Sequence, residues 1–509
     1  MSFPEVNKLR KAGRMEEAYN LAKKELNSDP DNIWNKRSMA WVLIMYLIQY
    51  AYSSENQKFL QTLSEFKDLK MPYNENEAMI FDNLKCWIAK FLSQLAKEDN
   101  PDTDLFEEFW EYIKETPYPK PSELHSGILR NFLKLKDKWI KMEDFLDWWD
   151  FNNFRKKDYE KVILEERTIM PLVEQAYLAL AKSIIKGESK NPLEYKETIN
   201  QEKLDRVLKE MQTLYQEHPE YEYFPYYIGL LLSAKGNNTK ALGELLPFAR
   251  EHTGRFWVWT LLGDIHKEDE EIQMACYCRG LMCKEPDKMT IGIRKKLTNL
   301  LIKNGFYPEA KYELNKIREI QEENEWKVSN GIKQQMDKEW YANTEMPKNN
   351  FHFYKKHAPQ ANAILAKDLD SMIGVVTNVK KDKKVLGYII DKNIQGGFNY
   401  SSFMGNPQPG DKIELWSVAK TNREGENYQK VIYAEITEKS PKEDILKELN
   451  GPIRVLEDKK IGFIEDAFIP PHMVEKHNLK HEQEIQAKAV LNYNKTKNEW
   501  GWMVLQVSK

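Results

Sequence analysis

The sequence predicts a multidomain protein in which a long all-helical solenoid is followed by two small all-β barrels. Apolar residues recur with the helical period of 3.6 over most of residues 1–345, and this period changes to 2 after residue 371. Small residues also recur about every 34 positions within the helical part. The chain has 509 residues, which is long for one domain, so two to four domains are expected.

The composition is that of a globular protein, with 41% hydrophobic and 30% charged residues. The net charge of −3 excludes a globally basic nucleic-acid binder but leaves local basic patches open. Only four cysteines are present, which indicates a reducing cytosol. The first residues lack the apolar core of a signal peptide, and the apolar run Trp41–Tyr52 is too short to cross a bilayer. We therefore expect a cytoplasmic protein with a buried helix at this run and no membrane segment; frequent Asn, Lys and Ile favour a bacterial source.

Small residues recur at a fixed period between residues 222 and 320. In each unit, one of them stands where two helices must approach closely. One such unit cannot bury its apolar face alone, so neighbouring units must stack into a helical body over residues 1–345. The recurring residues are Gly229 and Gly263, 34 positions apart, and Ala241, Ala275 and Ala310, 34 and 35 apart.

The residues around this period resemble the tetratricopeptide repeat. Trp259, Leu262, Gly263 and Ala275 fit the spacing of that repeat, and Pro286 lies close to its closing proline. The same pattern recurs more faintly upstream. The resemblance implies a solenoid of helix pairs that binds a partner protein.

The segment Asp144–Lys161 does not fit the repeat and gathers aromatic and cationic residues. Such a cluster can stack bases and grip phosphates, or it can form a protein-binding hot spot. The third interpretation, that the aromatic residues fill a junction between irregular helices, is favoured because aromatic clusters are more often core. The candidate protein-binding residues are Trp148, Trp149, Phe154 and Arg155.

Residues 346–370 lose the helical period and gain proline and asparagine, so we expect a linker with at most one short helix. Residues 371–440 then hold five strand-like runs separated by Gly, Pro and Asn clusters. Five short strands in a module of this size fit an OB-type barrel.

The order of motifs in this first barrel resembles the cold-shock domain. The matching pieces are "GVV", "KKVLGYI", "GFNYSSF" and "PQPGDKIEL". In that family, aromatic residues on the second and third strands bind bases. The resemblance places Leu386 and Tyr388 at the first aromatic pair and Asn399 and Tyr400 in the second group. It therefore implies that Tyr388 and Tyr400 bind nucleic acid.

A second module over residues 441–509 begins with the helix-like "PKEDILKELN". The pieces "KIGFIE", "DAFIPPHMVEKHNLKHEQEI" and "EWGWMVLQV" follow in order. They resemble the cold-shock-like RNA-binding domain of the transcription terminator Rho. The resemblance places Phe463 and Phe468 at the base-binding positions, with Ile461 in place of a further aromatic residue.

The last strand makes a separate argument for a binding surface. Trp500 and Trp502 share one face, and we expect the opposite face to fill the barrel. The two tryptophans would then be partly exposed near Lys460 and could stack bases, at roughly 1–3 kcal/mol per base. Alternatively, they pack against the other barrel or the solenoid. The residues expected to fill the barrel are Met503, Leu505 and Val507.

No sequence motif indicates catalysis, a cofactor or a metal. The phosphate-binding loop, zinc-protease, nucleophile-elbow and dinucleotide motifs are absent from the sequence. Three cysteines in "ACYCRGLMC" lack the second pair of a zinc site, so we expect buried free thiols. The histidines of "PPHMVEKHNLKH" are expected in a solvated loop.

The sequence thus predicts a non-enzymatic adaptor. Its solenoid would bind an unidentified partner protein, and its barrels would bind RNA or single-stranded DNA. The alternative is a pure protein-interaction scaffold whose barrels dock a partner, in the manner of accessory proteins of bacterial phage- or transposon-conflict systems. A third possibility, an enzyme with its site around Trp148–Lys161, has least support.

Overall fold

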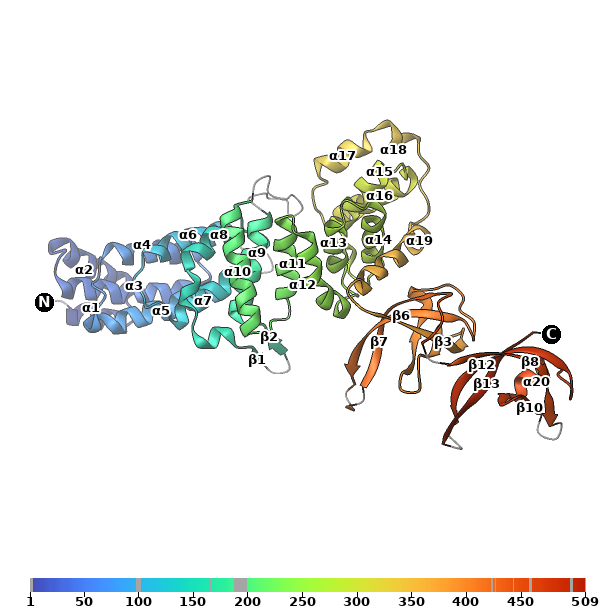
Figure 1. Ribbon diagram of the computed structural model, residues 1–509. Coiled ribbons are helices and arrows are strands. Elements are labelled where there is room, and N and C mark those ends of the chain that lie inside the picture. Colours follow the sequence, from blue (N-terminus) through green and yellow to red (C-terminus); the bar gives the residue numbers. More distant parts are fainter. Residues whose placement is uncertain are drawn as a thin grey trace. The chain divides into compact units, whose positions relative to one another are not determined.

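The protein is described by a computed structural model (Figure 1). The chain divides into two compact units, Met1–Asn237 and Asn238–Lys509. In the described part of the chain, no helix is long and apolar enough to cross a membrane. The structure describes residues 3–97, 102–164, 167–186, 199–422, 424–425, 427–442, 444–456, 460–494 and 498–508.

The first unit is helical, and its N-terminal helices form two layers (Figure 1). One layer, in which each helix contacts the next, is α1 (Phe3–Lys11), α3 (Ile33–Ser53), α5 (Ala78–Leu95) and α7 (Glu123–Phe132). The other layer contains α2 (Met15–Ser28), α4 (Asn56–Asp68) and α6 (Thr103–Glu115). The unit continues with α8 (Met142–Trp149), the hairpin of β1 (Val162–Leu164) and β2 (Arg167–Ile169), α9 (Leu172–Lys186), α10 (Gln201–Glu217) and α11 (Phe224–Ala234).

Helix α3 contains the most apolar run of the sequence. The side chain of Asn32 caps it by accepting a hydrogen bond from the Trp34 amide, and Ser54 ends it in the left-handed conformation. Met39, Leu43 and Leu47 are buried and recur every four residues, so α3 buries one broad side against its neighbours. The run is therefore a helix with a buried side, as the sequence predicts.

The second unit begins with helices that pack in consecutive pairs. Gly263 lies where α13 meets α14, because a Cβ atom there would stand 2.5 Å from the Tyr277 ring. Ala275 is fully buried. The small residues thus sit at close helix contacts, as their period predicts. The helices are α12 (Asn238–Glu251), α13 (Phe256–Ile265), α14 (Glu270–Leu281), α15 (Ile291–Lys303), α16 (Tyr307–Glu323), α17 (Asn330–Met336), α18 (Glu339–Asn343) and α19 (Phe351–Asn362).

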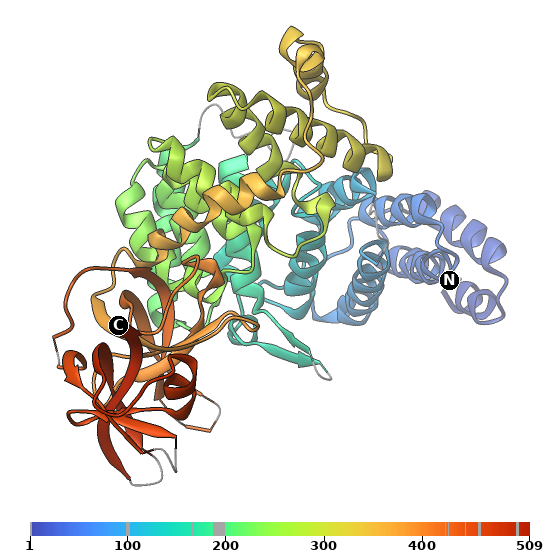
Figure 2. The ribbon, with the colours of Figure 1, turned by 90° about the vertical axis from the view of Figure 1, so that its right-hand side faces the viewer.

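The stretch expected to be a linker with at most one short helix is instead packed into the helical body, because its 12-residue helix α19 packs against α14 (Figure 2). Phe353 and Tyr354 are buried in the same core cluster as Tyr277 of α14. The buried Glu313 carboxylate of α16 also accepts hydrogen bonds from the Tyr354 hydroxyl and from Asn350 Nδ2. Residues 346–370 therefore belong largely to the helical body.

The first barrel is a five-stranded antiparallel sheet with strand order β5-β4-β3-β6-β7. Strand β5 also contacts β7, which closes the sheet. Inward-facing apolar residues such as Val376, Ile413 and Leu415 fill it. The strands are β3 (Ser371–Lys380), β4 (Val385–Ile389), β5 (Gln395–Asn399), β6 (Lys412–Thr421) and β7 (Asn427–Ile436).

The second barrel has six strands in the order β8-β12-β13-β11-β10-β9, with β11 and β13 parallel and the other pairs antiparallel. The second half of the segment expected to be helical belongs to β8 instead, because β8 pairs along its length with β12 and buries Leu449. The elements are β8 (Leu446–Pro452), β9 (Arg454–Leu456), β10 (Ile461–Ile464), β11 (Ala467–Ile469), α20 (Pro471–Lys476), β12 (Glu484–Asn494) and β13 (Glu499–Ser508).

The two barrels contact each other through apolar residues on their outer surfaces. Val375 and Ile389 of the first barrel form a buried cluster with Val490 and Leu491 of the second. The first barrel is also held to the helices, since Glu251 of α12 pairs with lysines of β6 and β7. The fold is therefore a helical solenoid followed by two OB-type barrels, as the sequence predicts.

Candidate nucleic-acid interface

Phe463 and Phe468 lie directly opposite each other on neighbouring strands of the second barrel. Strands β10 and β11 pair these two residues, and their ring centroids are 5.7 Å apart. On the β9 side, Arg454 is the partner of Phe463, and its guanidinium carbon lies 5.3 Å from the ring centroid. On the β13 side, Met503 is the partner of Phe468. Together these four residues form a line across the sheet, which we call the outer row.

The strand alternation directs the outer row away from the barrel core. Ile464, Ala467 and Ile469, the neighbours of the two phenylalanines along the strands, are fully buried in the core. Successive side chains of a strand point to opposite faces, so Phe463 and Phe468 point outward. Both rings are half-buried and Arg454 is exposed. The outer row is thus a partly exposed aromatic surface with a cation at one end.

The first barrel covers the continuation of this line. Met503 pairs with Val490 of β12, which in turn pairs with Leu446 of β8. Val490 is fully buried in the cluster shared with the first barrel. The accessible part of the line therefore runs from Arg454 to Met503, and the first barrel marks its end.

Lys460 lies in the turn that precedes β10, with a backbone φ of +53°. Its ammonium group is 2.9 Å from Glu475 Oε1 of α20, and this hydrogen bond raises the pKa of Lys460. The side chain is exposed, so the ion pair is solvated and weak. Lys460 stays a candidate phosphate contact near the outer row.

Trp500 and Trp502 do not share a face with the phenylalanines. Trp502 is the partner of the core residue Ala467, and it packs against the barrel core. Both tryptophans also contact the cluster that joins the two barrels. The ammonium group of Lys447 lies 4.2 Å from the centroid of the Trp502 ring. These tryptophans therefore pack within the second barrel and against the cluster that the two barrels share, and not beside the two phenylalanines.

Of the three residues expected to fill the barrel, Val507 packs against its core, whereas Met503 and Leu505 do not, and a register shift explains the difference. The pairing between β12 and β13 shifts between Lys488 and Ala489, which leaves Leu505 without a direct partner. Val504 consequently points into the barrel and is fully buried, whereas Met503 points outward beside Phe468. The sequence alternation alone does not reveal such a bulge.

Tyr388 and Tyr400 are core residues of the first barrel, which corrects their assignment as base-binding residues. Tyr388 is 2% and Tyr400 6% exposed, and both pack in the barrel core with Leu386. Burial raises the pKa of Tyr388. The physical reason is the alternation of β4, which turns Leu386 and Tyr388 into the core and leaves Gly387 and Ile389 on the outer face.

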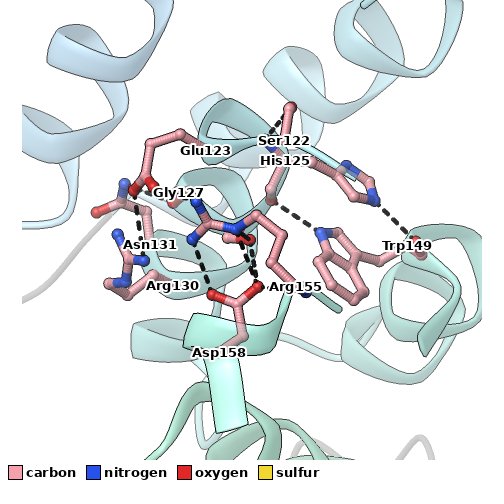
Figure 3. Close-up of polar contacts among 10 residues, drawn as sticks. Ser122, Glu123, His125, Gly127, Arg130, Asn131, Trp149, Arg155 and Asp158 are labelled. Atoms are coloured by element: carbon pink, nitrogen blue, oxygen red, sulfur yellow. Dashed lines mark hydrogen bonds and ion pairs between the residues drawn. The ribbon is translucent and has the colours of Figure 1, made fainter. Parts of the chain in front are cut away.

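The segment Asp144–Lys161 packs against α7 in the first unit, through Trp149, Arg155 and Asp158 (Figure 3). Trp149 is fully buried and its ring stacks on His125 at a centroid distance of 4.4 Å. The Trp149 Nε1–H donates to the His125 carbonyl, and His125 Nε2 donates to the Trp149 carbonyl, both at 2.9 Å. The Tyr118 hydroxyl then donates to His125 Nδ1. Burial lowers the pKa of His125 to about 4, so its ring is neutral at pH 7.

Arg155 is held by acidic residues of the same unit (Figure 3). Its Nη2 lies 2.8 Å from Asp158 Oδ1, and its Nη1 pairs with Glu123. Trp149 and Arg155 are thus occupied by internal contacts and are unavailable as a binding hot spot. Trp148 and Phe154 are half-buried in the same segment, and Phe154 lines an open hollow of about 610 Å³.

The cysteines and histidines form no metal centre within the described residues, where no group of three or more potential ligands exists. Cys276 and Cys278 are buried free thiols, and burial raises the pKa of each. Cys283 is partly buried and Cys86 is exposed.

Comparison with known families identifies both barrels. Residues 366–430 match S1/CSD-like domain 1 of the TOTE conflict systems, and residues 447–507 match S1/CSD-like domain 2 of the same systems. The resemblance of both barrels to cold-shock domains is therefore confirmed. Residues 222–361 match a domain of unknown function, DUF7017, which spans α11 to α19 and so includes most of the expected linker. No curated protein matches the chain.

Sequence reasoning found Phe463 and Phe468 but missed Arg454 and Met503. Both join the outer row only through strand pairing, across β9–β10 and β11–β13. The Arg454 contact has a local signal, because "IRVL" is followed closely by "IGFI" and the two runs can form a hairpin. The Met503 contact is long-range and carries no local signal.

Proposed function

We propose that the chain is a non-enzymatic adaptor of a conflict system that binds single-stranded nucleic acid through the outer row of its second barrel. The observation that carries this proposal is the facing pair Phe463 and Phe468, with Arg454 over one ring, on the outer face of an S1/CSD-like domain. The helical part serves as the arm that binds a partner protein.

The chemistry of the outer row favours the unpaired bases of a single strand over a double-stranded nucleic acid. Two neighbouring rings offer flat apolar faces on which successive unpaired bases stack, at roughly 1–3 kcal/mol per base. Arg454 at the end of the row can contact a phosphate or stack on a base. Arg454 and Lys460 flank the outer row, and Lys447 pairs with Asp466 in the turn between β10 and β11. With so few cations, binding should weaken with salt along a shallow slope.

The first barrel has a supporting role in this proposal. Its inward tyrosines leave no aromatic pair on the β4 face, and its outer residues Val375 and Ile389 are covered by the second barrel. It thereby fixes the second barrel next to the helical body. RNA and single-stranded DNA share the stacking chemistry, so both are candidate ligands.

A second candidate function is a scaffold whose barrels dock a protein. The half-buried Phe468 and Met503 favour it, because the outer row is more apolar than cationic. One experiment separates the two functions.

The experiment measures binding of the full chain to labelled 20-nucleotide uridine and deoxythymidine oligomers by fluorescence anisotropy at low salt. Replacing Phe463 and Phe468 together by alanine should weaken binding by at least tens of fold, since roughly 1–3 kcal/mol is lost for each base. The control is Tyr428→Ala, which removes an exposed ring of the first barrel and should change nothing. Circular dichroism checks that both variants fold.

Two outcomes would contradict the proposal. If the unmodified chain binds neither oligomer, the scaffold function replaces it. If the double variant binds as tightly as the unmodified chain, the outer row is not the site.

A further inference from the structure

Helix α3 carries a row of apolar side chains on its outer side. Trp34, Trp41, Met45, Ile48 and Tyr52 are spaced by seven, four, three and four residues, which places them on one face of the helix. Trp34 is 55% and Tyr52 is 67% exposed, and the other three are partly exposed. We call this row the α3 stripe. Exposed apolar rows of this length on a folded protein mark interaction surfaces.

The neighbouring helices of the same layer add one cation beside Trp41 and one beside Tyr52. The guanidinium carbon of Arg10 in α1 lies 5.4 Å from the centroid of the Trp41 ring. The ammonium group of Lys90 in α5 lies 3.6 Å from the centroid of the Tyr52 ring and 4.5 Å from that of Trp87. Trp41 and Tyr52 of the stripe thus each lie beside a positive charge from a neighbouring helix.

These two cations have no acidic partner among the described residues. Arg10 donates to the Asn7 side-chain oxygen at 2.9 Å, and within the described part of the chain the Lys90 ammonium group lies against the two rings and no carboxylate. Partial burial lowers the pKa of Arg10, with no carboxylate to offset it. A carboxylate arriving from outside would therefore find both charges available.

The helices around the α3 stripe carry a net positive charge, like Arg10 and Lys90. Helices α1, α3 and α5 together carry seven Lys or Arg residues and two Asp or Glu residues. The opposite layer of α2, α4 and α6 carries five Lys residues and ten Asp or Glu residues. The α3 stripe thus lies in the basic layer, and this asymmetry favours an acidic partner on that side.

We infer that the α3 stripe docks an acidic amphipathic segment of a partner protein. Apolar side chains of that segment would pack on Trp41, Met45 and Ile48, and its carboxylates would pair with Arg10 and Lys90. A protein segment fits better than nucleic acid. Met45 and Ile48, the aliphatic centre of the stripe, would pack on apolar side chains and offer no contact to a phosphate. This inference deepens the proposed partner-binding role of the helical part and is independent of the outer row.

The test uses the full chain and two fluorescein-labelled 18-residue helical peptides. Both peptides present Leu and Trp on one face, and the polar face carries Glu in one peptide and Lys in the other. The acidic peptide should bind, and the basic peptide should not. Charge reversal by Lys90→Glu should weaken binding of the acidic peptide by roughly tenfold, and Tyr52→Ala should weaken it similarly.

The matched control is Lys114→Glu on α6. The Lys114 ammonium group lies 4.4 Å from the centroid of the Trp110 ring, but it belongs to the acidic layer and pairs with Glu111. This variant should bind the acidic peptide like the unmodified chain. Both Lys90→Glu and Tyr52→Ala should retain oligonucleotide binding, so failure here is distinct from failure at the outer row.

Three results would overturn the inference. Failure of the acidic peptide to bind the unmodified chain would show that the stripe is not such a docking site. Equal binding of the two peptides would remove the charge argument. Loss of oligonucleotide binding in Lys90→Glu, with peptide binding intact, would assign the stripe to nucleic acid.

Discussion

Replacing Glu313 by leucine should release α19 from the helical body. The Glu313 carboxylate is fully buried and accepts hydrogen bonds from Arg294 Nη1 at 2.8 Å and from Asn350 Nδ2 at 2.7 Å, as well as from the Tyr354 hydroxyl. The variant leaves the Arg294 charge buried without this partner. Breaking one side of a buried ion pair costs about 3–5 kcal/mol.

Because Asn350 and Tyr354 belong to the α19 segment, the variant should lower the free energy needed to open α19 away from the helical body by this amount. Trypsin cleavage at Lys355 and Lys356 reports the open population. A shift of about 3 kcal/mol corresponds to cleavage more than about a hundred times faster. Mass spectrometry of the fragments of the full chain identifies the cut.

The double variant Arg294→Met with Glu313→Leu is the matched control. It removes both charges together, so it should be cleaved more slowly than the single variant. Cleavage of the single variant at the rate of the unmodified chain would refute the assignment of Glu313 as the anchor of α19. Rapid cleavage of the unmodified chain at these lysines would refute the packing itself.

Two further predictions concern the helix contacts of each unit. Ala275→Leu should destabilise the second unit by about 1–3 kcal/mol through overpacking next to the Gly263 contact, and an unchanged melting temperature would count against this packing. His125 should titrate near its lowered pKa of about 4, measured by NMR of its ring protons. Because the folded state disfavours the charged ring, the stability it contributes is complete above pH 6.5 and is lost as the pH falls towards 4, by about 3 kcal/mol in total. Titration near 6.5 would show that the ring is solvated and not stacked on Trp149.

The change of hydrophobic period allowed the fold class to be predicted from the sequence. The helical part and the two barrels follow from local patterns, and the pair Phe463 and Phe468 follows from a short motif around one turn. Such features depend on residues close together in the chain. The tetratricopeptide pattern around Gly263 stays a prediction, supported by the close contact of that glycine with Tyr277.

The incorrect predictions concern side chains and segments whose placement depends on residues far away in the sequence. The outward or inward direction of Trp502 depends on a bulge in its pairing with β12. The α19 segment contains Pro359 and a polar pattern, and its burial depends on Arg294 and Glu313, which lie far earlier in the chain. Local propensity does not contain this information, and tertiary packing overrides it.

The most direct test of the central claim is to map where a nucleic acid contacts the folded chain. The full chain would be cross-linked by light to a uridine oligomer that contains 4-thiouridine, and the modified peptides would be identified by mass spectrometry. The account predicts cross-links at Phe463, Phe468 or Met503, and their loss in the double alanine variant. Cross-links confined to the helices, with none in residues 444–508, would contradict it.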